Sequence, residues 1–121
     1  MKISRMISRM AIFGFVLVNP SLAQDNKVDK SIYEGWRTIR QLDCARCHGA
    51  SYQGNVGPSL VESVRTRQRE TFIRIVLEGN AERGMPPYKS VKRAKDNIDG
   101  IYRYFMGRAD GTISAGSLIE E

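Results

Sequence analysis

The residues most suited to chemistry lie together in the pentapeptide Cys44-Ala45-Arg46-Cys47-His48. It holds both cysteines and the single histidine of the 121 residues. Two thiols separated by two residues and followed by an imidazole form the attachment signature of a c-type haem. The thiols reach the two vinyl groups on one edge of the porphyrin, and the imidazole comes under the iron. We therefore predict one covalent haem c, attached at Cys44 and Cys47, with His48 as its proximal ligand.

Three other interpretations of this motif are weaker. A thioredoxin-like redox pair would be expected near a βαβ pattern, which the sequence lacks. A disulfide between Cys44 and Cys47 would close a small, strained loop and would leave His48 without a role. A zinc ion would need a fourth ligand, and no carboxylate cluster is placed to supply it.

The second axial ligand is sought among methionines, because no further histidine is available and a thioether suits haem iron. Downstream of residue 23 the candidates are Met85 and Met106. Met106 falls within a predicted helix close to its apolar stripe, where methionine usually packs. Met85 lies in Gly84-Met85-Pro86-Pro87-Tyr88, a stiff segment in which prolines exclude a helix. We prefer Met85 to Met106, and an open or water-filled position is the remaining alternative.

Apolar spacing predicts an all-α fold. The expected helices run from Ser31 to the Cys44 segment, from about Thr71 to Glu78, and from near Asp96 to about residues 107–111. Ser31 and Glu34 have the spacing of a capping box for the first helix. The connections 49–63 and 80–95 are too long for a helical bundle without a bound group, so we expect a group to fill the space that they enclose. A haem would fill that space.

Gly35 and Gly100 lie inside the first and last predicted helices. Each costs about 1 kcal/mol relative to alanine in a helix. A close crossing of the two helices would explain this cost, and a merely tolerated glycine is the alternative.

The first 23 residues have the organisation of a secretory signal peptide. Lys2, Arg5 and Arg9 precede the apolar run 10–18, and Ser21-Leu22-Ala23 offers small residues for cleavage. An uncleaved anchor is the alternative, but a nine-residue run is shorter than the ~20 residues that span a bilayer. We expect a cleaved signal peptide at 1–23 and a domain at 24–121 without a membrane span, exported to the periplasm.

Composition is that of one globular domain, with 41% hydrophobic and 26% charged residues. Cleavage would remove three of the 19 basic residues, leaving 16 against 13 acidic ones. Nine basic residues between 65 and 95 have little aromatic interleaving, which disfavours nucleic-acid binding. They form either a solvated face or a patch that steers an acidic protein partner. We expect a monomer that binds no nucleic acid.

Several motifs in order resemble the class I monohaem cytochromes c over nearly all of residues 24–121. They are the haem motif, Gly57-Pro58-Ser59-Leu60, Gly84-Met85-Pro86-Pro87 and the aromatic segment 101–105. The resemblance implies a small fold of three main helices and long loops around one haem, with thioether bonds at Cys44 and Cys47. It also implies axial ligands His48 and Met85, a Pro58 carbonyl supporting His48, and crossed terminal helices.

The segment 108–113 and the Met-Pro-Pro loop together resemble small periplasmic cytochromes that serve PQQ-dependent alcohol dehydrogenases. This implies a one-electron carrier rather than an enzyme, reduced by a dehydrogenase and oxidised by the respiratory chain. Two alternatives are a haem subunit of a larger oxidoreductase complex, and a ligand sensor or peroxidase-like protein with an open distal position. Arg83, Tyr88 and Lys89 flank the ligand loop and are candidates for contacts to the haem propionates.

Overall fold

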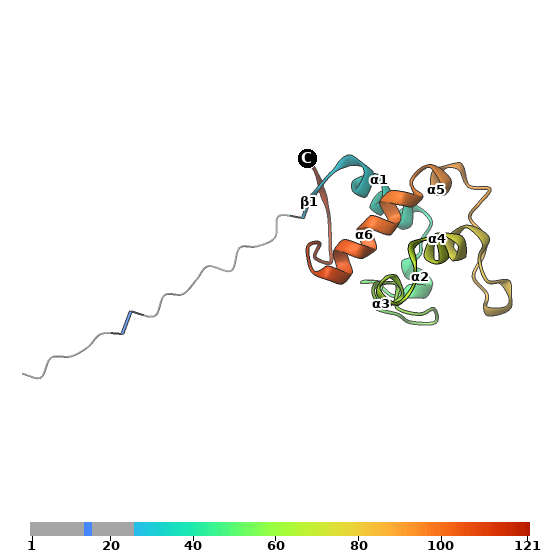
Figure 1. Cartoon of the computed structure of the whole chain (residues 1–121), viewed down its shortest axis with the longest axis horizontal. Coiled ribbons are helices and arrows are strands. Elements are labelled where there is room, and N and C mark those ends of the chain that lie inside the picture. The colour runs from blue at the N-terminus through green and yellow to red at the C-terminus, as the bar shows by residue number, and fades with distance from the viewer. Residues whose placement is uncertain (1–13, 16–25) are drawn as a thin grey trace, which may run out of the picture.

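The computed structural model describes residues 14–15 and 26–121 (Figure 1). The elements of the described part are β1 (Lys27–Val28), α1 (Lys30–Gln41), α2 (Ala45–His48), α3 (Leu60–Thr66), α4 (Arg69–Glu78), the 3-10 helix η1 (Ala81–Arg83), α5 (Lys92–Asp96), α6 (Ile98–Asp110) and β2 (Ile119–Glu120). The expected all-α class is confirmed. No helix in residues 14–15 and 26–121 is long and apolar enough to cross a membrane. Apart from residues 14 and 15, the predicted signal peptide lies outside the described residues.

The start of α1 differs from the prediction. Asp29 is its N-cap, and the carboxylate accepts a hydrogen bond from the backbone N–H of Ile32 at 3.0 Å. Ser31 therefore lies inside the first turn, and the expected Ser31–Glu34 capping box is wrong. Asp29 can cap the helix and also pair with Arg103 of α6, so one carboxylate satisfies two partners.

The crossing of α1 and α6 forms the centre of the fold (Figure 1). A Cβ added to Gly35 would meet the Gly100 carbonyl oxygen at 2.6 Å and would come still closer to its carbonyl carbon. A Cβ on Gly100 would collide with the backbone of Ser31. The two backbones are thus in contact, which confirms the predicted close crossing and explains why both positions are glycine.

Aromatic side chains fill the core beside this crossing. The rings of Tyr52 and Phe105 meet edge to face at 5.2 Å, and Phe72 of α4 packs 6.0 Å from Phe105. Arg69 of α4 pairs with Asp99 of α6 at 2.6 Å on the surface of the same contact. Helix α6 is therefore held from two sides, by α1 and by α4.

The two connections expected to lack structure contain short helices. The first holds α3, whose N-cap Ser59 accepts a hydrogen bond from Glu62 N–H at 3.1 Å. The second holds η1 and α5. In addition, α4 starts at Arg69, before the predicted Thr71, and α6 starts at Ile98, after the predicted Asp96. Helices of three to seven residues are too short to give a clear apolar period.

Two parallel strands join the ends of the folded part. Lys27 pairs with Ile119 and Val28 with Glu120. The Asn26 side chain donates hydrogen bonds to the carbonyls of Ser114 and Ser117, both at 3.3 Å. Figure 1 shows the C-terminus beside β1. Strands of two residues carry no readable alternation, so the sequence did not predict them.

Candidate haem-binding site

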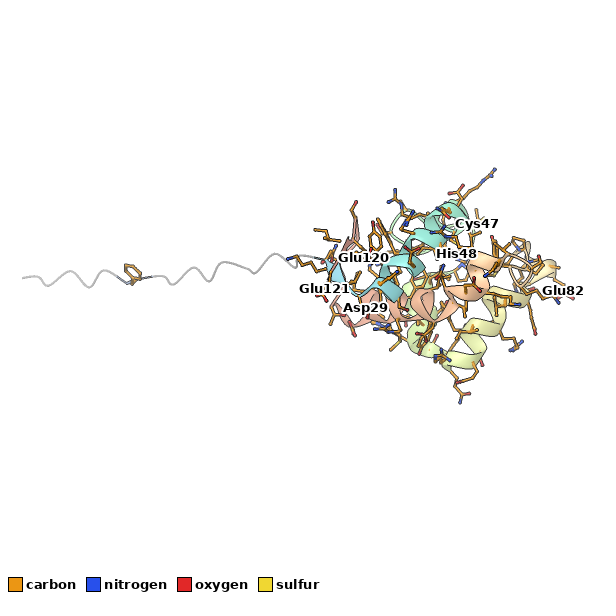
Figure 2. The ribbon with its side chains drawn as sticks, turned by 90° about the horizontal axis from the view of Figure 1, so that it is seen from above. Asp29, Cys47, His48, Glu82, Glu120 and Glu121 are labelled. Carbon is orange, nitrogen blue, oxygen red and sulfur yellow. The ribbon has the colours of Figure 1, made fainter. Side chains whose placement is uncertain are left out.

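The motif itself forms a helical turn directly after α1. The N–H of Cys44 donates to Ile39 O at 3.1 Å, and the N–H of His48 donates to Cys44 O at 3.0 Å. Residues three and four apart lie on one side of a helix. The turn therefore brings Cys47 and His48 to the same side as Cys44. Figure 2 shows the labelled side chains of Cys47 and His48 close together.

Both cysteines are free thiols in different surroundings. Cys47 is exposed and Cys44 is partly buried. Burial, with a smaller contribution from the negative charge of Asp43, raises the pKa of the Cys44 thiol to about 11. Redox-active pairs depend on a lowered thiol pKa. This pair therefore does not suit thiol–disulfide exchange, and both thiols are free for covalent attachment.

His48 is 8% exposed, and the orientation of its ring is defined by a backbone group. Its Nδ1 lies 2.8 Å from the carbonyl oxygen of Pro58. Because a carbonyl only accepts, Nδ1–H must be the donor, and the lone pair of the neutral ring is then on Nε2. Such a hydrogen bond also raises the basicity of a ligating imidazole. His48 is thus prepared to bind a metal through Nε2.

Glycines pack the segment after His48 tightly. The N–H of Gly57 donates to Cys47 O at 2.7 Å, and the N–H of Gly54 donates to His48 O at 2.8 Å. A Cβ on Gly57 would lie 2.9 Å from both Cε1 and Nδ1 of the His48 ring. In the sequence, Gly57 belongs to the Gly57-Pro58-Ser59-Leu60 motif, but no role in holding the His48 ring was predicted for it. Its position immediately before Pro58 was the available signal.

Met85 lies on a small hairpin that follows α4. Its N–H donates to Asn80 O at 3.0 Å, and its carbonyl accepts from Asn80 N–H at 2.9 Å. Gly79 has a left-handed φ of 71°, and a Cβ there would lie 2.6 Å from Met85 O. From the sequence, Gly79 and Asn80 only marked the end of the preceding helix and had no expected role at the site. The backbone of Met85 is therefore fixed by both of its polar groups and by a close glycine.

The other methionine lies elsewhere. Met106 on α6 is 37% exposed, and it lines a surface hollow with Ile32, Arg103 and the residues of β1. No residue of the haem motif lines that hollow. The structure therefore does not bring Met106 together with His48.

Tyr88 follows the Met85 hairpin and is half-buried. Burial raises the pKa of its hydroxyl, and the electrostatic influence of Cys44, Cys47 and Asp43 raises it further. The expected contacts of Arg83, Tyr88 and Lys89 to the haem propionates stay a prediction.

The donor set fits a covalent haem better than a metal ion alone. Among the residues that the structure describes, no group of three or more His, Cys, Asp or Glu side chains is arranged to hold a metal ion. Two free thiols, a tautomer-fixed imidazole and a backbone-fixed thioether are what an attached haem requires.

Comparisons with known proteins identify the family. Residues 30–105 match the family model described as cytochrome C oxidase, cbb3-type, subunit III. Cytochrome c-555 of Methylococcus capsulatus is 37% identical over 92 residues, which cover 75% of this chain and 73% of that protein. The chain belongs to the c-type cytochromes. The cytochrome is also 36% identical to cytochrome c55X of Pseudomonas aeruginosa over 78 residues, covering 64% of this chain and 65% of the relative.

The fold of the cytochrome has a solved counterpart. The crystal structure of the c-type cytochrome XoxG from Methylobacterium extorquens AM1 matches with a TM-score of 0.70 and 28% identity. The match covers 78% of this chain and 61% of XoxG, so the cytochrome spans less than two thirds of that protein. The predicted class I fold and its covalently bound haem c are confirmed. The cytochrome is a monohaem electron carrier.

Proposed function

We propose that the cytochrome is a periplasmic carrier that accepts single electrons from a PQQ-dependent dehydrogenase and passes them to the respiratory chain. Cys44 and Cys47 attach the haem, and His48 and Met85 are its axial ligands. The observation that carries this proposal is the His48–Pro58 hydrogen bond at 2.8 Å, because it leaves Nε2 for the iron. The fixed backbone of the Met85 hairpin gives further support.

The role of the protein is to hold both ligands in place during electron transfer. Haem c supplies the one-electron chemistry, with iron alternating between the ferrous and ferric states. Pro58 holds the His48 ring, and Asn80 and Gly79 hold the Met85 backbone. Because neither ligand has to leave, little structural change accompanies transfer. A methionine ligand also favours the ferrous state relative to a second histidine.

The proposed donor is supported by the resemblance of segment 108–113 and the Met-Pro-Pro loop to cytochromes that serve PQQ-dependent alcohol dehydrogenases. Within that segment, Asp110 accepts hydrogen bonds from the N–H of Thr112 at 2.9 Å and from its hydroxyl at 2.6 Å. These bonds hold the pKa of Asp110 below its usual value. The chain therefore turns compactly at the end of α6.

Electrostatic steering involves fewer residues than the sequence suggests. Five of the nine basic residues between 65 and 95 form ion pairs with acids of the same chain; they are Arg65, Arg69, Arg74, Lys92 and Arg93. The exposed side chains of Arg67, Arg83, Lys89 and Lys95 are the proposed steering residues for an acidic partner. The association rate with the donor should fall as ionic strength rises.

The test uses the mature haem protein. A PQQ-dependent dehydrogenase should reduce it rapidly in stopped-flow mixing, and Met85→Ala should abolish the long-wavelength band of a sulfur-ligated ferric haem. Met106→Ala is the matched control and should keep the band. A band retained by Met85→Ala would refute the ligand assignment, and failure of such dehydrogenases to reduce the protein would refute the donor.

A second function is favoured by the description of the matching family as an oxidase subunit. In that case the cytochrome would be a fixed haem subunit rather than a free carrier. The two differ in purification under native conditions: a free carrier elutes alone, whereas a subunit elutes with its complex. A sensor or peroxidase-like function lacks support, because the single histidine already donates Nδ1–H to Pro58.

A further inference from the structure

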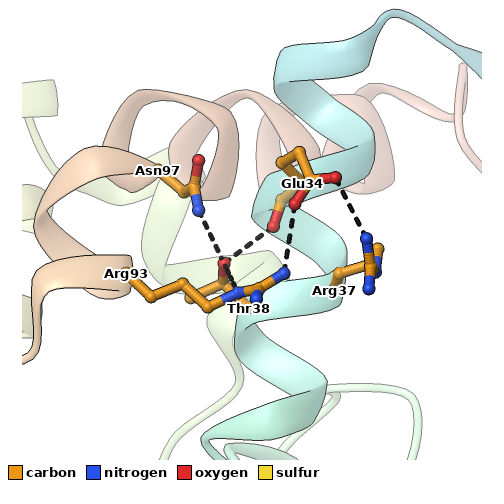
Figure 3. Close-up of polar contacts among 5 residues, drawn as sticks. All are labelled: Glu34, Arg37, Thr38, Arg93 and Asn97. Carbon is orange, nitrogen blue, oxygen red and sulfur yellow. Dashed lines mark hydrogen bonds and ion pairs between the residues drawn. The ribbon is translucent and has the colours of Figure 1, made fainter.

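A cluster of polar side chains connects α1 with the start of the final helices (Figure 3). We call Glu34, Thr38, Arg93 and Asn97 the α1–α5 latch. Thr38 is fully buried at 0% exposure. Its hydroxyl donates to Glu34 O at 2.7 Å and accepts from Asn97 Nδ2 at 3.1 Å. The latch therefore satisfies a buried hydroxyl with groups from both sides of the contact.

Arg93 is the member of the latch that lies on α5. Its Nε donates to the Thr38 hydroxyl at 3.3 Å, and one terminal nitrogen pairs with the Glu34 carboxylate at 3.1 Å. Arg37 also pairs with Glu34, at 3.2 Å, but it belongs to α1 itself and takes no part in the hydrogen bonds drawn to the Thr38 hydroxyl. Only the Arg93 pair therefore joins two elements, and the Arg37 pair lies within α1.

The latch closes one end of the loop that carries Met85. Between Met85 and the latch, the N–H groups of Tyr88 and Lys89 both donate to Leu77 O at 3.0 Å, which ties the downstream arm of the loop to α4. After Val91 the chain enters α5, a helix of five residues. A helix of this length does not hold itself in place without tertiary contacts. Those contacts are the buried Ala94 and the latch.

The opposite side of the latch leads to the haem motif. Thr38 and Glu34 belong to the helix that runs directly into Cys44, and Ile39 O accepts the hydrogen bond from the Cys44 N–H. One polar cluster thus joins α1, which leads into the attachment motif, to α5, which follows the Met85 loop. It is one of the contacts between the two ligand-bearing parts of the chain.

We propose that Arg93 is a positioning residue for Met85, holding the downstream end of the ligand loop against α1 so that the thioether stays on the iron. The inference rests on the proposed role of Met85 as axial ligand. When the latch opens, α5 is no longer held against α1, and the hydrogen bonds of Tyr88 and Lys89 to Leu77 are left to restrain the downstream arm of the loop. The first event is then exchange of the sulfur for an external ligand, before global unfolding.

The experiment compares Arg93→Gln with the matched control Arg37→Gln in the oxidised haem protein. Both remove one arginine partner of Glu34, and only the first opens the latch. We expect added imidazole to replace the sulfur ligand about tenfold faster in Arg93→Gln, in line with couplings between contacting residues. Arg37→Gln should stay within about twofold of the wild type. Arg93→Lys keeps a charge near Glu34 and should give an intermediate rate.

Hydrogen exchange gives a readout that does not involve the iron. The N–H groups of Val91 and Lys95 donate to Tyr88 O and Val91 O, at the end of the loop that leads into α5. Their exchange rates should rise in Arg93→Gln and should stay at the wild-type values in Arg37→Gln. Urea unfolding of each variant shows whether Arg93→Gln merely destabilises the whole protein. In that case all amides would accelerate together.

Two results would overturn the proposal in different ways. Equal imidazole rates in Arg93→Gln and Arg37→Gln, with a sulfur band present in both, would reject the latch and leave Met85 as ligand. If Met85→Ala has the imidazole rate and the spectrum of the wild type, Met85 is not the ligand, and the latch proposal fails with it. An acceleration explained entirely by lower global stability would also reject a positioning role.

Discussion

His48 and Met85 stand on segments whose backbones are held in different ways. Around His48, hydrogen bonds join Cys47 to Gly57, His48 to Gly54, and the imidazole to Pro58, all within a stretch of about ten residues. Around Met85, local hydrogen bonds join Met85 to Asn80 and join Tyr88 and Lys89 to Leu77, but they hold only the backbone, and η1 contains no buried residue. Beyond Val91 the chain enters α5, which the latch attaches to α1.

This difference indicates which of the two ligands dissociates from the iron more readily. The histidine segment is a local unit whose bonds must break together. The support of the methionine segment also includes the α1–α5 latch, whose residues are distant in the sequence, so this part can weaken by itself. We therefore expect changes at the His48 segment to affect attachment and stability, and changes at the Met85 segment to affect ligand exchange first.

The largest effect is expected at the crossing of α1 and α6, which supports both the His48 segment and the Met85 segment. Gly35→Ala places a methyl group against the backbone of Gly100 and should lower the free energy of unfolding by ~3 kcal/mol or more. Urea denaturation of the haem protein measures this loss. The control Gly111→Ala adds a methyl group into open space at a left-handed φ and should cost only ~1–2 kcal/mol. Equal losses would show that the helix crossing is not tight.

The second effect belongs to the histidine side. Gly57→Ala would push the His48 ring away from Pro58 and should cost ~1–3 kcal/mol, as overpacking does. The fraction of chains carrying haem should fall with it. Val56→Ala in the same loop changes a side chain that is 87% exposed and should alter neither quantity. An unaltered haem fraction in Gly57→Ala would remove the proposed link between this glycine and ligand geometry.

The third effect concerns the glycine that packs against the backbone of the Met85 segment. Gly79→Ala and Gly84→Ala both place alanine at a left-handed φ, so both carry a strain of ~1–2 kcal/mol. Only at Gly79 does the new methyl group meet the backbone of Met85 and Pro86. Gly79→Ala should therefore weaken the sulfur-to-iron band and speed carbon monoxide binding to the reduced protein, and Gly84→Ala should do neither. Identical spectra would contradict a close fit at Gly79.

The smallest effect lies away from both segments. The hydrogen bond from Ile32 N–H, followed by that from Arg103, holds the pKa of Asp29 below its usual 3.8. A depressed pKa contributes stability that is complete above the unfolded value and is lost as pH falls through the folded value. Asp29→Ala should cost ~1 kcal/mol at pH 7, with the gap to wild type narrowing below about pH 4. Stability curves at several pH values measure this, and the ligand spectra should not change.

The parts predicted from the sequence are those whose signal is local. The haem motif and the Gly35–Gly100 crossing were predicted because each needs residue types that have few other uses. The Asp29 cap was missed because Ser31 and Glu34 offered an equally good local pattern, and Arg103, which decides between them, lies in another helix. The Glu34–Arg93 pair joins residues far apart in the chain, so no sequence window contains it.

The pairing of β1 with β2 has a practical consequence. Asp29, Glu120 and Glu121 lie at one end of the folded part and Glu82 at the other, with Cys47 and His48 between them (Figure 2). Ile119 N–H donates to Asn26 O at 3.0 Å, so a short peptide from Glu121 back to Asn26 would suit the molecule to circular permutation with new ends opened elsewhere. Equally, an immobilising tag at this end can fix the molecule to an electrode and leave the Glu82 end facing the solution.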